Sequence, residues 1–354
     1  MTPPVTGPVL VVGSGLLGAS IGLALRRAGV HVWLDDVDPD AMAQAVGRGA
    51  GEPWRPDAGE PRLVVVAVPP AAAGPAIARA GAFPQATVTD VTSVKAEPLA
   101  AARAAGADPA RLVGGHPLAG RETSGAGAAR QDLFDDRVWV ISPLPESDPV
   151  RVEAVMDLVV TCGAVPVVMA PEDHDRAVAL TSHAPQLLSS LLAARLLDAD
   201  PDAVAVSGQG LRDMTRIAAS DPALWQSILD ANAEPVADVL EAFAQDLDAV
   251  IARLRRHDDV ADALARGVEG RLRIPGKHGA AATAYDLVPV IIRDEPGELG
   301  RLFLAAGDLG VNLEDVRIDH VLGKPSGLVE LSVRPESTVR LVEGLGALGF
   351  DVRA

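Results

Sequence analysis

Val9-Leu10-Val11-Val12-Gly13-Ser14-Gly15-Leu16-Leu17-Gly18 is a short apolar run, a glycine-rich turn and the start of an apolar helix. We expect Gly13 to allow the tight turn, Gly15 to let a pyrophosphate approach the backbone, and Gly18 to let the helix pack closely. The helix N-terminus would then face the phosphates with its partial positive charge. The stretch therefore predicts a dinucleotide site formed by residues 13–18.

An acidic pair, Asp35 and Asp36, follows the second expected strand, about 20 residues after the turn. A carboxylate at this place accepts hydrogen bonds from the ribose hydroxyls and repels a 2′-phosphate, so it favours NAD over NADP. We take Asp36 as the ribose-binding residue. The alternative is that both aspartates belong to a solvated turn.

Short apolar runs alternate with alanine-rich helical segments as far as residue 170. Because these runs are apolar throughout, both faces of the strands should be buried, as in a parallel sheet covered by helices. We expect an α/β domain of the Rossmann type at residues 1–170. Its strands are predicted at Val9–Val12, Val30–Leu34, Leu63–Val68, Thr87–Asp90, Leu112–Gly115, Val138–Ile141 and Val165–Val168.

The rest of the chain divides into two regions and a connection. Residues 171–268 show only helical spacing and predict an all-helical substrate and dimerisation domain. The apolar stripe of its last long helix, from Val236 to Leu254, could pack within one subunit or against a second copy, and we expect a homodimer. Residues 269–285 resemble a linker. Residues 286–354 predict a ferredoxin-like α+β domain of order β-α-β-β-α-β, with strands at Leu287–Arg293, Asn312–His320, Gly327–Arg334 and Phe350–Arg353.

Composition excludes several classes of protein. The 354 residues suggest two or three domains, and the formal net charge of −17 opposes binding to nucleic acid or to anionic membranes. Cys162 is the only cysteine and lies in an apolar stretch, which suits a reducing cytoplasm. The sequence has neither the features of a signal peptide nor an apolar run of the roughly 18–20 residues that span a membrane. We also expect no metal, because His, Cys and acidic residues are not clustered with ligand spacing.

One histidine stands at the end of a predicted strand, in Gly114-Gly115-His116-Pro117-Leu118-Ala119-Gly120. An imidazole has an ordinary pKa of about 6.5, so His116 could act as a general base near neutral pH. Its alternative is a structural ring bonded to a carbonyl. Ser93 follows another strand, in Asp90-Val91-Thr92-Ser93-Val94-Lys95, and could cap the next helix or present its hydroxyl to a nicotinamide and to His116.

Further polar groups lie in the helical region. Thr181-Ser182-His183-Ala184-Pro185-Gln186 interrupts the helical pattern and places His183 and Gln186 at a helix start. Arg212 and Arg216 are four residues apart, on one face of an expected helix, where Arg216 could instead pair with Asp213. Asp221-Pro222 then begins another helix, with Trp225 one turn in.

Several of these motifs resemble the prephenate dehydrogenase family. They are Gly114-Gly115-His116-Pro117-Leu118-Ala119-Gly120-Arg121-Glu122-Thr123-Ser124-Gly125, Ser182-His183-Ala184-Pro185 and Asp213-Met214-Thr215-Arg216-Ile217-Ala218, in the family's order. The resemblance implies NAD-dependent oxidative decarboxylation of prephenate to 4-hydroxyphenylpyruvate in tyrosine biosynthesis. It implies that His116 removes the proton of the ring hydroxyl, that Ser93 orients His116 and the cofactor, and that Arg216 holds the ring carboxylate. Glu122, His183 and Trp225 match pocket positions of the family.

Gln186 departs from the family pattern. Many prephenate-specific members have Ser-His-Leu-Pro-His where this chain has a glutamine as the last residue. A glutamine there resembles members that use arogenate, because an amide oxygen can accept from the ammonium of arogenate. The choice between prephenate and arogenate is therefore open.

The C-terminal region resembles the ACT domain, a small regulatory module that often binds amino acids. Asp294-Glu295-Pro296-Gly297-Glu298-Leu299-Gly300 follows a predicted strand, and Gly297 would let a ligand reach the backbone at a helix N-terminus. This predicts a regulatory site at Asp294, Pro296, Gly297 and Leu299 with tyrosine as effector. A module that serves only dimerisation is the alternative.

Two other functions are compatible with parts of the pattern. A β-hydroxyacid dehydrogenase or imine reductase also joins such an N-terminal domain to helices, but it usually has a catalytic Lys or Asp where this chain offers His183 and Gln186. A sensor without catalysis would bind NAD and an amino acid and turn over neither substrate.

Overall fold

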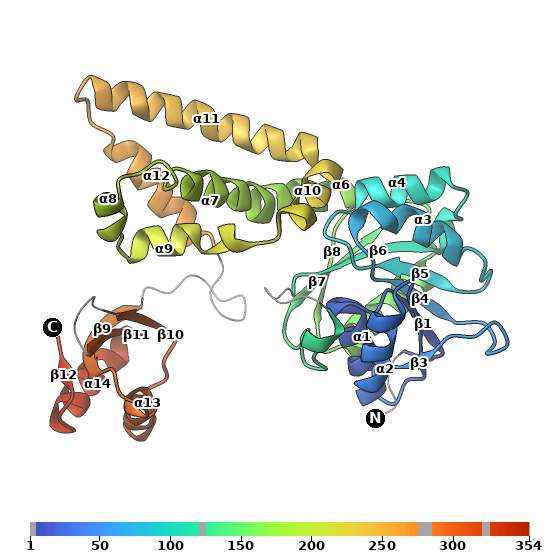
Figure 1. Ribbon diagram of the computed structural model, residues 1–354, viewed down its shortest axis with the longest axis horizontal. Helices are drawn as coiled ribbons and strands as arrows, with labels where there is room; N and C mark the ends of the chain where they lie inside the picture. The colour runs from blue at the N-terminus through green and yellow to red at the C-terminus, as the bar shows by residue number, and fades with distance from the viewer. Residues whose placement is uncertain (1–4, 120–124, 275–284, 321–325, 354) are drawn as a thin grey trace. The chain divides into compact units, whose positions relative to one another are not determined.

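The computed structural model describes residues 5–119, 125–274, 285–320 and 326–353 (Figure 1). The chain forms two compact units, Met1–Gln245 and Asp246–Ala354. In the described residues, no helix has both the length and the apolar character needed to cross a membrane.

An eight-stranded sheet forms the centre of the first unit. Its order is β3-β2-β1-β4-β5-β6-β7-β8, and its neighbouring strands are parallel except for the antiparallel pair β6–β7. The strands are β1 (Val9–Val12), β2 (Val32–Asp35), β3 (Glu52–Pro53), β4 (Leu63–Val66), β5 (Thr87–Asp90), β6 (Leu112–Pro117), β7 (Val138–Pro143) and β8 (Val165–Val168). The predicted fold class is thus confirmed, although the two-residue strand β3 is too short to have left a pattern.

Helices cover both faces of this sheet, as the apolar strands predicted. Val9 and Val11 pack into one core with residues of α1 (Leu16–Arg27), α2 (Pro39–Gly47) and α5 (Pro149–Thr161). Leu10, between them, points into a second core with α3 (Pro70–Ala80) and α4 (Ala96–Ala104) on the opposite face (Figure 1).

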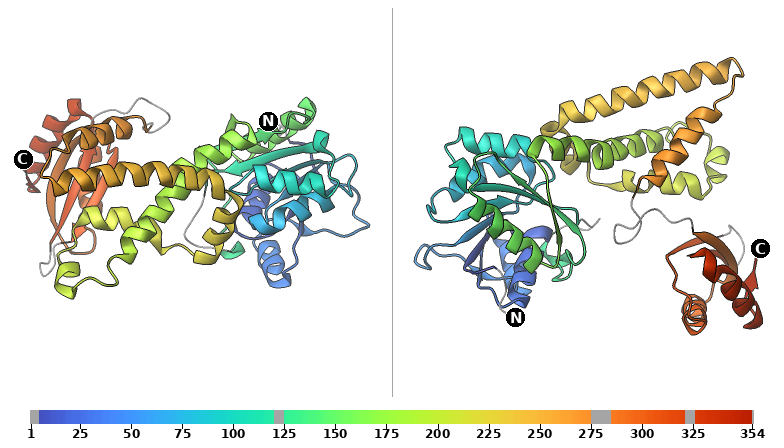
Figure 2. Two further views of the ribbon diagram at one scale, coloured as in Figure 1. Left: turned by 90° about the horizontal axis from the view of Figure 1, so that it is seen from above. Right: turned by 180° about the vertical axis from the view of Figure 1, so that it is seen from behind.

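The remainder of the first unit is helical, also as predicted. It contains α6 (Pro171–Val178), the π-helical turn η3 (Ala179–His183), α7 (Ala184–Ala194), α8 (Pro201–Ala205), α9 (Gln209–Thr215), the 3₁₀ turn η4 (Arg216–Ala219), α10 (Pro222–Ala231) and α11 (Ala233–Arg255). Two further 3₁₀ turns, η1 (Pro109–Arg111) and η2 (Ala126–Ala128), lie in the sheet region. Helix α11 is long and uninterrupted and continues into the second unit (Figure 2).

The second unit ends in a small sheet of order β10-β11-β9-β12, antiparallel at every pairing. After α12 (Ala261–Leu272) the chain gives β9 (Asp286–Arg293), α13 (Glu298–Asp308), β10 (Asp315–His320), β11 (Ser326–Val333), α14 (Pro335–Ala347) and β12 (Asp351–Val352). This is the predicted β-α-β-β-α-β order. Helix α12 extends to Leu272, so the first residues of the expected linker are helical.

Candidate active site

The turn between β1 and α1 contains three glycines, two of which are closely packed while the third faces open space. Gly13 has φ +95°, and a Cβ there would lie 2.4 Å from the carbonyl oxygen of Ala67. A Cβ on Gly18 would lie 1.9 Å from the carbonyl oxygen of Gly13, whereas a Cβ on Gly15 would meet no atom within 4 Å. Space is therefore open over the N-terminus of α1, and this cradle fits the phosphates of a dinucleotide.

Asp36 lies directly beside this turn. Its carboxylate accepts hydrogen bonds from the backbone N–H of Ser14 at 2.5 Å and from the Ser14 hydroxyl at 2.6 Å, and from the N–H of Asp38 at 2.9 Å. Partial burial alone would raise the pKa of Asp36, but these hydrogen bonds lower it below its ordinary value. Asp36 is thus an ionised acceptor at the end of β2, whereas Asp35 is exposed.

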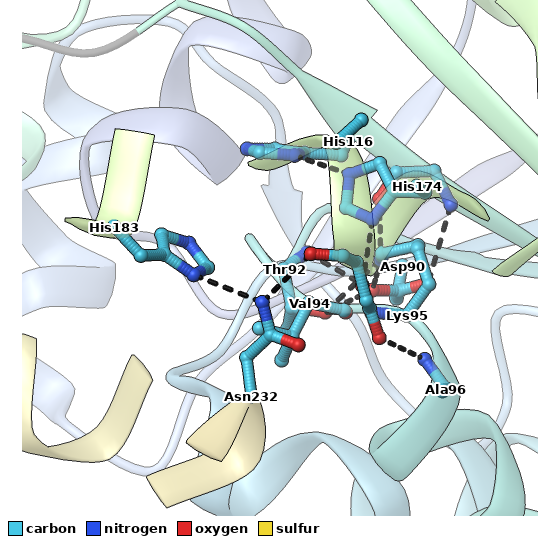
Figure 3. A network of polar contacts seen from close by, with 12 residues as sticks. Asp90, Thr92, Val94, Lys95, Ala96, His116, His174, His183 and Asn232 are labelled. Atoms are coloured by element: carbon cyan, nitrogen blue, oxygen red, sulfur yellow. Dashed lines mark hydrogen bonds and ion pairs between the residues drawn. The ribbon is translucent and has the colours of Figure 1, made fainter. Parts of the chain in front are cut away.

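His116 lies inside β6, which continues two residues farther than predicted because β7 pairs with it, His116 opposite Val140. The ring is half-buried, and its Nδ1 lies 2.8 Å from Nε2 of His174 on α6 (Figure 3). Burial, and then the proximity of His174, Lys95 and His183, hold the pKa of His116 well below its ordinary value. The imidazole is therefore a neutral acceptor at neutral pH.

A buried ion pair holds the backbone just before His116. Strand β5 ends at Asp90, and its pairing with β6 stops at Val113, so Gly115 has no strand partner on that side. In its place the N–H of Gly115 donates to Oδ1 of Asp90 at 3.2 Å, and Nζ of Lys95 donates to the carbonyl of Gly115 at 2.6 Å. Lys95 also pairs with Asp90 and donates to the hydroxyl of Thr92 at 3.0 Å (Figure 3).

Both side chains of this pair are fully buried. Burial lowers the pKa of Lys95, while the neighbouring Asp90 opposes that shift. Gly114 and Gly115 leave room for the pair, since a Cβ on Gly114 would lie 3.1 Å from Cδ of Lys95 and one on Gly115 would lie 2.6 Å from the carbonyl oxygen of Asp90. The two glycines before the histidine thus serve the ion pair that positions it.

Asp175 of α6 caps helix α4. Its carboxylate accepts from the backbone N–H of Lys95 and from that of Ala96, both at 2.8 Å, and from Nδ1 of His174 at 2.7 Å. The capping role considered for Ser93 is therefore wrong, because α4 begins at Ala96 and its cap comes from another helix. Ser93 is half-buried on the same loop, and its proposed contact with the nicotinamide stays a prediction.

His183 is buried at the end of the π-helical turn η3. The amide nitrogen of Asn232 lies 3.0 Å from its Nδ1 and also donates to the carbonyl of Asp175 at 2.9 Å (Figure 3). Nδ1 of His183 is thus an acceptor and Nε2 a donor. Burial lowers the pKa of His183 to about 4. The ring of Trp225 contacts it edge-on, with 5.9 Å between the centroids.

Gln186 and Arg216 lie on neighbouring elements. The amide nitrogen of Gln186, a buried residue of α7, donates to the carbonyl of Ile217 in η4 at 2.9 Å, which fixes the orientation of the amide. Arg216 is exposed and begins η4. It does not share a helix with Arg212 as expected, because α9 ends at Thr215. Glu122 lies outside the described residues.

Sequence reasoning missed the roles of Asp90, Lys95, His174, Asp175 and Asn232. The lysine could have been suspected, because it is one of three in the whole chain and follows a buried strand. His174 and Asp175 stand in the run Glu172-Asp173-His174-Asp175-Arg176, which is typical of a solvated helix start. In the part of the chain that the structure describes, no group of His, Cys and acidic residues is placed to hold a metal ion.

An open glycine turn over a helix N-terminus, and a neutral histidine farther along the same carboxyl edge of a parallel sheet, are the arrangement of a dinucleotide-dependent dehydrogenase. Comparisons with known proteins narrow this class. The prephenate dehydrogenase nucleotide-binding domain matches residues 21–168, and the prephenate dehydrogenase dimerization domain matches residues 170–269. The chain belongs to the prephenate dehydrogenase family, as the motifs around His116 predicted.

Relatives and solved structures agree with this assignment. The chain is 38% identical to the probable prephenate dehydrogenase NovF of Streptomyces niveus, over 95% of this chain and 96% of that protein. It is 26% identical to the prephenate dehydrogenase of Bacillus subtilis, over 95% and 94%. The A. aeolicus prephenate dehydrogenase in complex with hydroxyphenyl propionate and NAD+ superposes with a TM-score of 0.68 at 28% identity, over 76% of this chain and 98% of that one. Synechocystis arogenate dehydrogenase gives 0.64 at 27%, over 74% and 98%.

Proposed function

We propose that the protein catalyses the NAD-dependent oxidative decarboxylation of prephenate to 4-hydroxyphenylpyruvate, with His116 as the base. The observation that carries the proposal is a neutral, half-buried imidazole held by its backbone and by His174, on the sheet edge that also carries the open glycine turn. Residues 13–18 and Asp36 would hold NAD, whose nicotinamide accepts a hydride when bound. The relatives named above support the same reaction.

The chemistry asks little of the protein beyond a base and orientation. Nε2 of His116 would take the proton of the ring hydroxyl as the same carbon loses a hydride, which NAD held by residues 13–18 and Asp36 would accept. The bond to the ring carboxylate then breaks, carbon dioxide leaves, and the electron pair makes the ring aromatic. His116 returns its proton to the ring oxygen, so the products are 4-hydroxyphenylpyruvate, carbon dioxide and NADH. Ser93 would orient His116, and Arg216 would hold the ring carboxylate.

Arogenate is the second candidate substrate. The hydrogen bond from the nitrogen of Gln186 to Ile217 fixes the amide, whose oxygen would accept a hydrogen bond from an ammonium group. The similarity to Synechocystis arogenate dehydrogenase is compatible with this choice. Glu122, His183 and Trp225 would complete the pocket for either substrate.

We assign the parts of the chain as follows. Residues 1–170 bind NAD, residues 171–268 bind substrate and form a homodimer, residues 269–285 link, and residues 286–354 regulate as an ACT domain. The dimer is supported by the half-exposed apolar side chains of α11, Phe243, Leu247 and Leu254. The buried thiol Cys162, whose pKa burial raises to about 12, suits a cytoplasmic enzyme.

Tyrosine is the proposed effector of the second unit. Gly297 has φ +96° and caps α13, and with Asp294, Pro296 and Leu299 it lines a cavity between β9 and α13. A ligand there would meet the backbone at a helix N-terminus, which suits the carboxylate of an amino acid.

Steady-state kinetics with prephenate and arogenate, each with NAD and NADP and with and without tyrosine, test these assignments together. We expect NADH and carbon dioxide to form, NAD to be preferred, and tyrosine to inhibit. His116→Asn should lower kcat at least about 100-fold, because it removes the base, while NAD binding stays unchanged. Turnover retained in that variant would falsify the assignment of the base, and absence of turnover with both substrates would contradict the function.

A further inference from the structure

We propose that His174 is a positioning residue that, together with Asp175, fixes the tautomer of His116 so that Nε2 carries the lone pair. The inference rests on the proposed function for its catalytic consequence. Its structural part, the position of one proton, can be measured without substrate.

The argument begins at Asp175, whose role as acceptor is fixed by the backbone. Oδ1 accepts the N–H of Lys95 at 2.8 Å, and Oδ2 accepts the N–H of Ala96 at 2.8 Å. These donors belong to the N-cap residue and to the first residue of α4, so both oxygens face the positive end of the helix and act as acceptors. An ionised carboxylate has no hydrogen to donate.

The direction of the next hydrogen bond follows from this. Nδ1 of His174 lies 2.7 Å from Oδ1 of Asp175 and must donate to it. When the ring of His174 is neutral and its Nδ1 donates, its other nitrogen, Nε2, has no hydrogen and accepts. Both residues are buried, so water does not compete for these groups.

The direction of the hydrogen bond between His116 and His174 follows in the same way. Its Nδ1 lies 2.8 Å from Nε2 of His174 and must be the donor of that hydrogen bond. Nε2 of His116 is then the unprotonated nitrogen. The two hydrogen bonds from His116 to His174 and from His174 to Asp175 thus make Nε2 the basic nitrogen of His116. A buried Asp selects the tautomer of the histidine in a Ser-His-Asp triad in the same way.

This arrangement also suits the proton balance of the reaction. His116 returns to the product the proton that it takes from the substrate, so His174 and Asp175 need not carry a proton to solvent. While His116 is charged, its Nδ1–H donates to a nitrogen that Asp175 polarises, which stabilises the cation. Because the effect acts on the base and not on substrate contacts, it should change kcat and leave KM nearly unchanged.

The test uses the full chain and three variants. His174→Leu removes the acceptor, His174→Gln replaces Nε2 by an amide oxygen that can accept from His116, and His31→Leu is the matched control at an exposed histidine outside the network. The main readout is the ¹⁵N–¹H correlation spectrum of histidine side chains in ¹⁵N-histidine protein without ligands. The second readout is kcat and KM for prephenate and arogenate with NAD.

We expect His116 of the unsubstituted chain to be protonated at Nδ1 only, and the Nε2–H form to become populated in His174→Leu. We expect kcat to fall about 10- to 100-fold in His174→Leu, with KM changed less than about twofold, and to recover in large part in His174→Gln. His31→Leu should match the unsubstituted chain in both readouts.

The proposal is overturned if His116 of the unsubstituted chain carries its proton on Nε2, or if His174→Leu leaves the tautomer and kcat unaltered. The spectrum of the unsubstituted chain decides the first point even if His174→Leu does not fold. If neither substrate is turned over but the tautomer depends on His174, the proposed function fails and the tautomer assignment stands.

Discussion

Lys95 is a buried cation whose hydrogen bonds go to Asp90, to Thr92 and to the carbonyl of Gly115. A buried pair of this kind contributes little net stability compared with apolar residues, but loss of one partner leaves the other charge uncompensated. The pair binds the backbone of Gly115, where β5 no longer pairs with β6. We therefore infer that its role is to hold the backbone next to His116.

We predict that Lys95→Met destabilises the protein by about 3–5 kcal/mol, because Asp90 would remain buried and unpaired. Asp90→Asn combined with Lys95→Met removes the stranded charge and should recover part of that loss. Urea unfolding followed by tryptophan fluorescence measures both. If the double variant is as unstable as Lys95→Met, the unpaired charge of Asp90 is not the cause of the lost stability.

At this scale the sequence identified some residues and concealed others. His116 was singled out by the glycines and the proline around it and by the family resemblance, and its role as the base stays a prediction. His174 could not be predicted, because its acidic neighbours are those of an exposed helix, and only the fold turns its ring towards His116. Asn232 and Asp175 act through contacts 49 and 80 residues away along the chain, to His183 and to Lys95.

Strand β6 carries His116, and the neighbouring strands leave little space beside its backbone. A Cβ on Gly115 would lie 2.6 Å from the carbonyl oxygen of Asp90 and 3.0 Å from Nε1 of Trp139. Both neighbours belong to buried strands that cannot move aside without disturbing the sheet. The backbone of β6 would have to shift, and His116 with it.

We predict that Gly115→Ala destabilises the protein by about 1–3 kcal/mol through overpacking and also lowers kcat by displacing His116. Gly47→Ala is the matched control, since a Cβ at Gly47, the last residue of α2, meets no atom within 4 Å. Thermal unfolding and steady-state kinetics check the two effects. A Gly115→Ala variant as stable and active as Gly47→Ala would contradict the close contact.

The elements were predicted to the extent that they depend on local pattern. The strands of the parallel sheet and those of the smaller antiparallel sheet were predicted from the pattern of apolar residues. The observed β1, β5 and β8 have the predicted bounds. The extension of β6 to Pro117 depends on pairing with β7, which is distant in sequence. The π-helical turn η3 left only an interruption of the helical pattern, although such turns are frequent at functional sites.

At the scale of the whole molecule, the family match and the compact units divide the chain differently. The two matched domains cover residues 21–168 and 170–269, whereas the first compact unit extends to Gln245 and includes both the nucleotide turn and the histidine network. All four tryptophans, Trp33, Trp54, Trp139 and Trp225, lie in this first unit. Tryptophan fluorescence therefore follows the unfolding of the unit that carries the site.

This allows a prediction about acid stability. Burial lowers the pKa of His183 to about 4 and that of His116 well below its ordinary value. The unfolded chain therefore binds more protons than the folded one below about pH 6.5, so stability is full above that pH and falls as the pH decreases towards 4. For His183 alone the loss is about 3 kcal/mol across this window, at 1.36 kcal/mol per pKa unit.

Urea unfolding at pH 7, 6, 5 and 4, followed by tryptophan fluorescence, measures this dependence. His183→Asn is the informative variant, because its amide oxygen can accept from Asn232 as Nδ1 does but has no proton to gain. The difference in unfolding free energy between the unsubstituted chain and the variant should shift by about 3 kcal/mol in favour of the variant from pH 7 to pH 4. Asp36, whose pKa is lowered by hydrogen bonds from its ordinary value of 3.8, stays ionised in this window when the chain is folded. A difference that stays constant with pH would show that His183 titrates alike in the folded and unfolded chain.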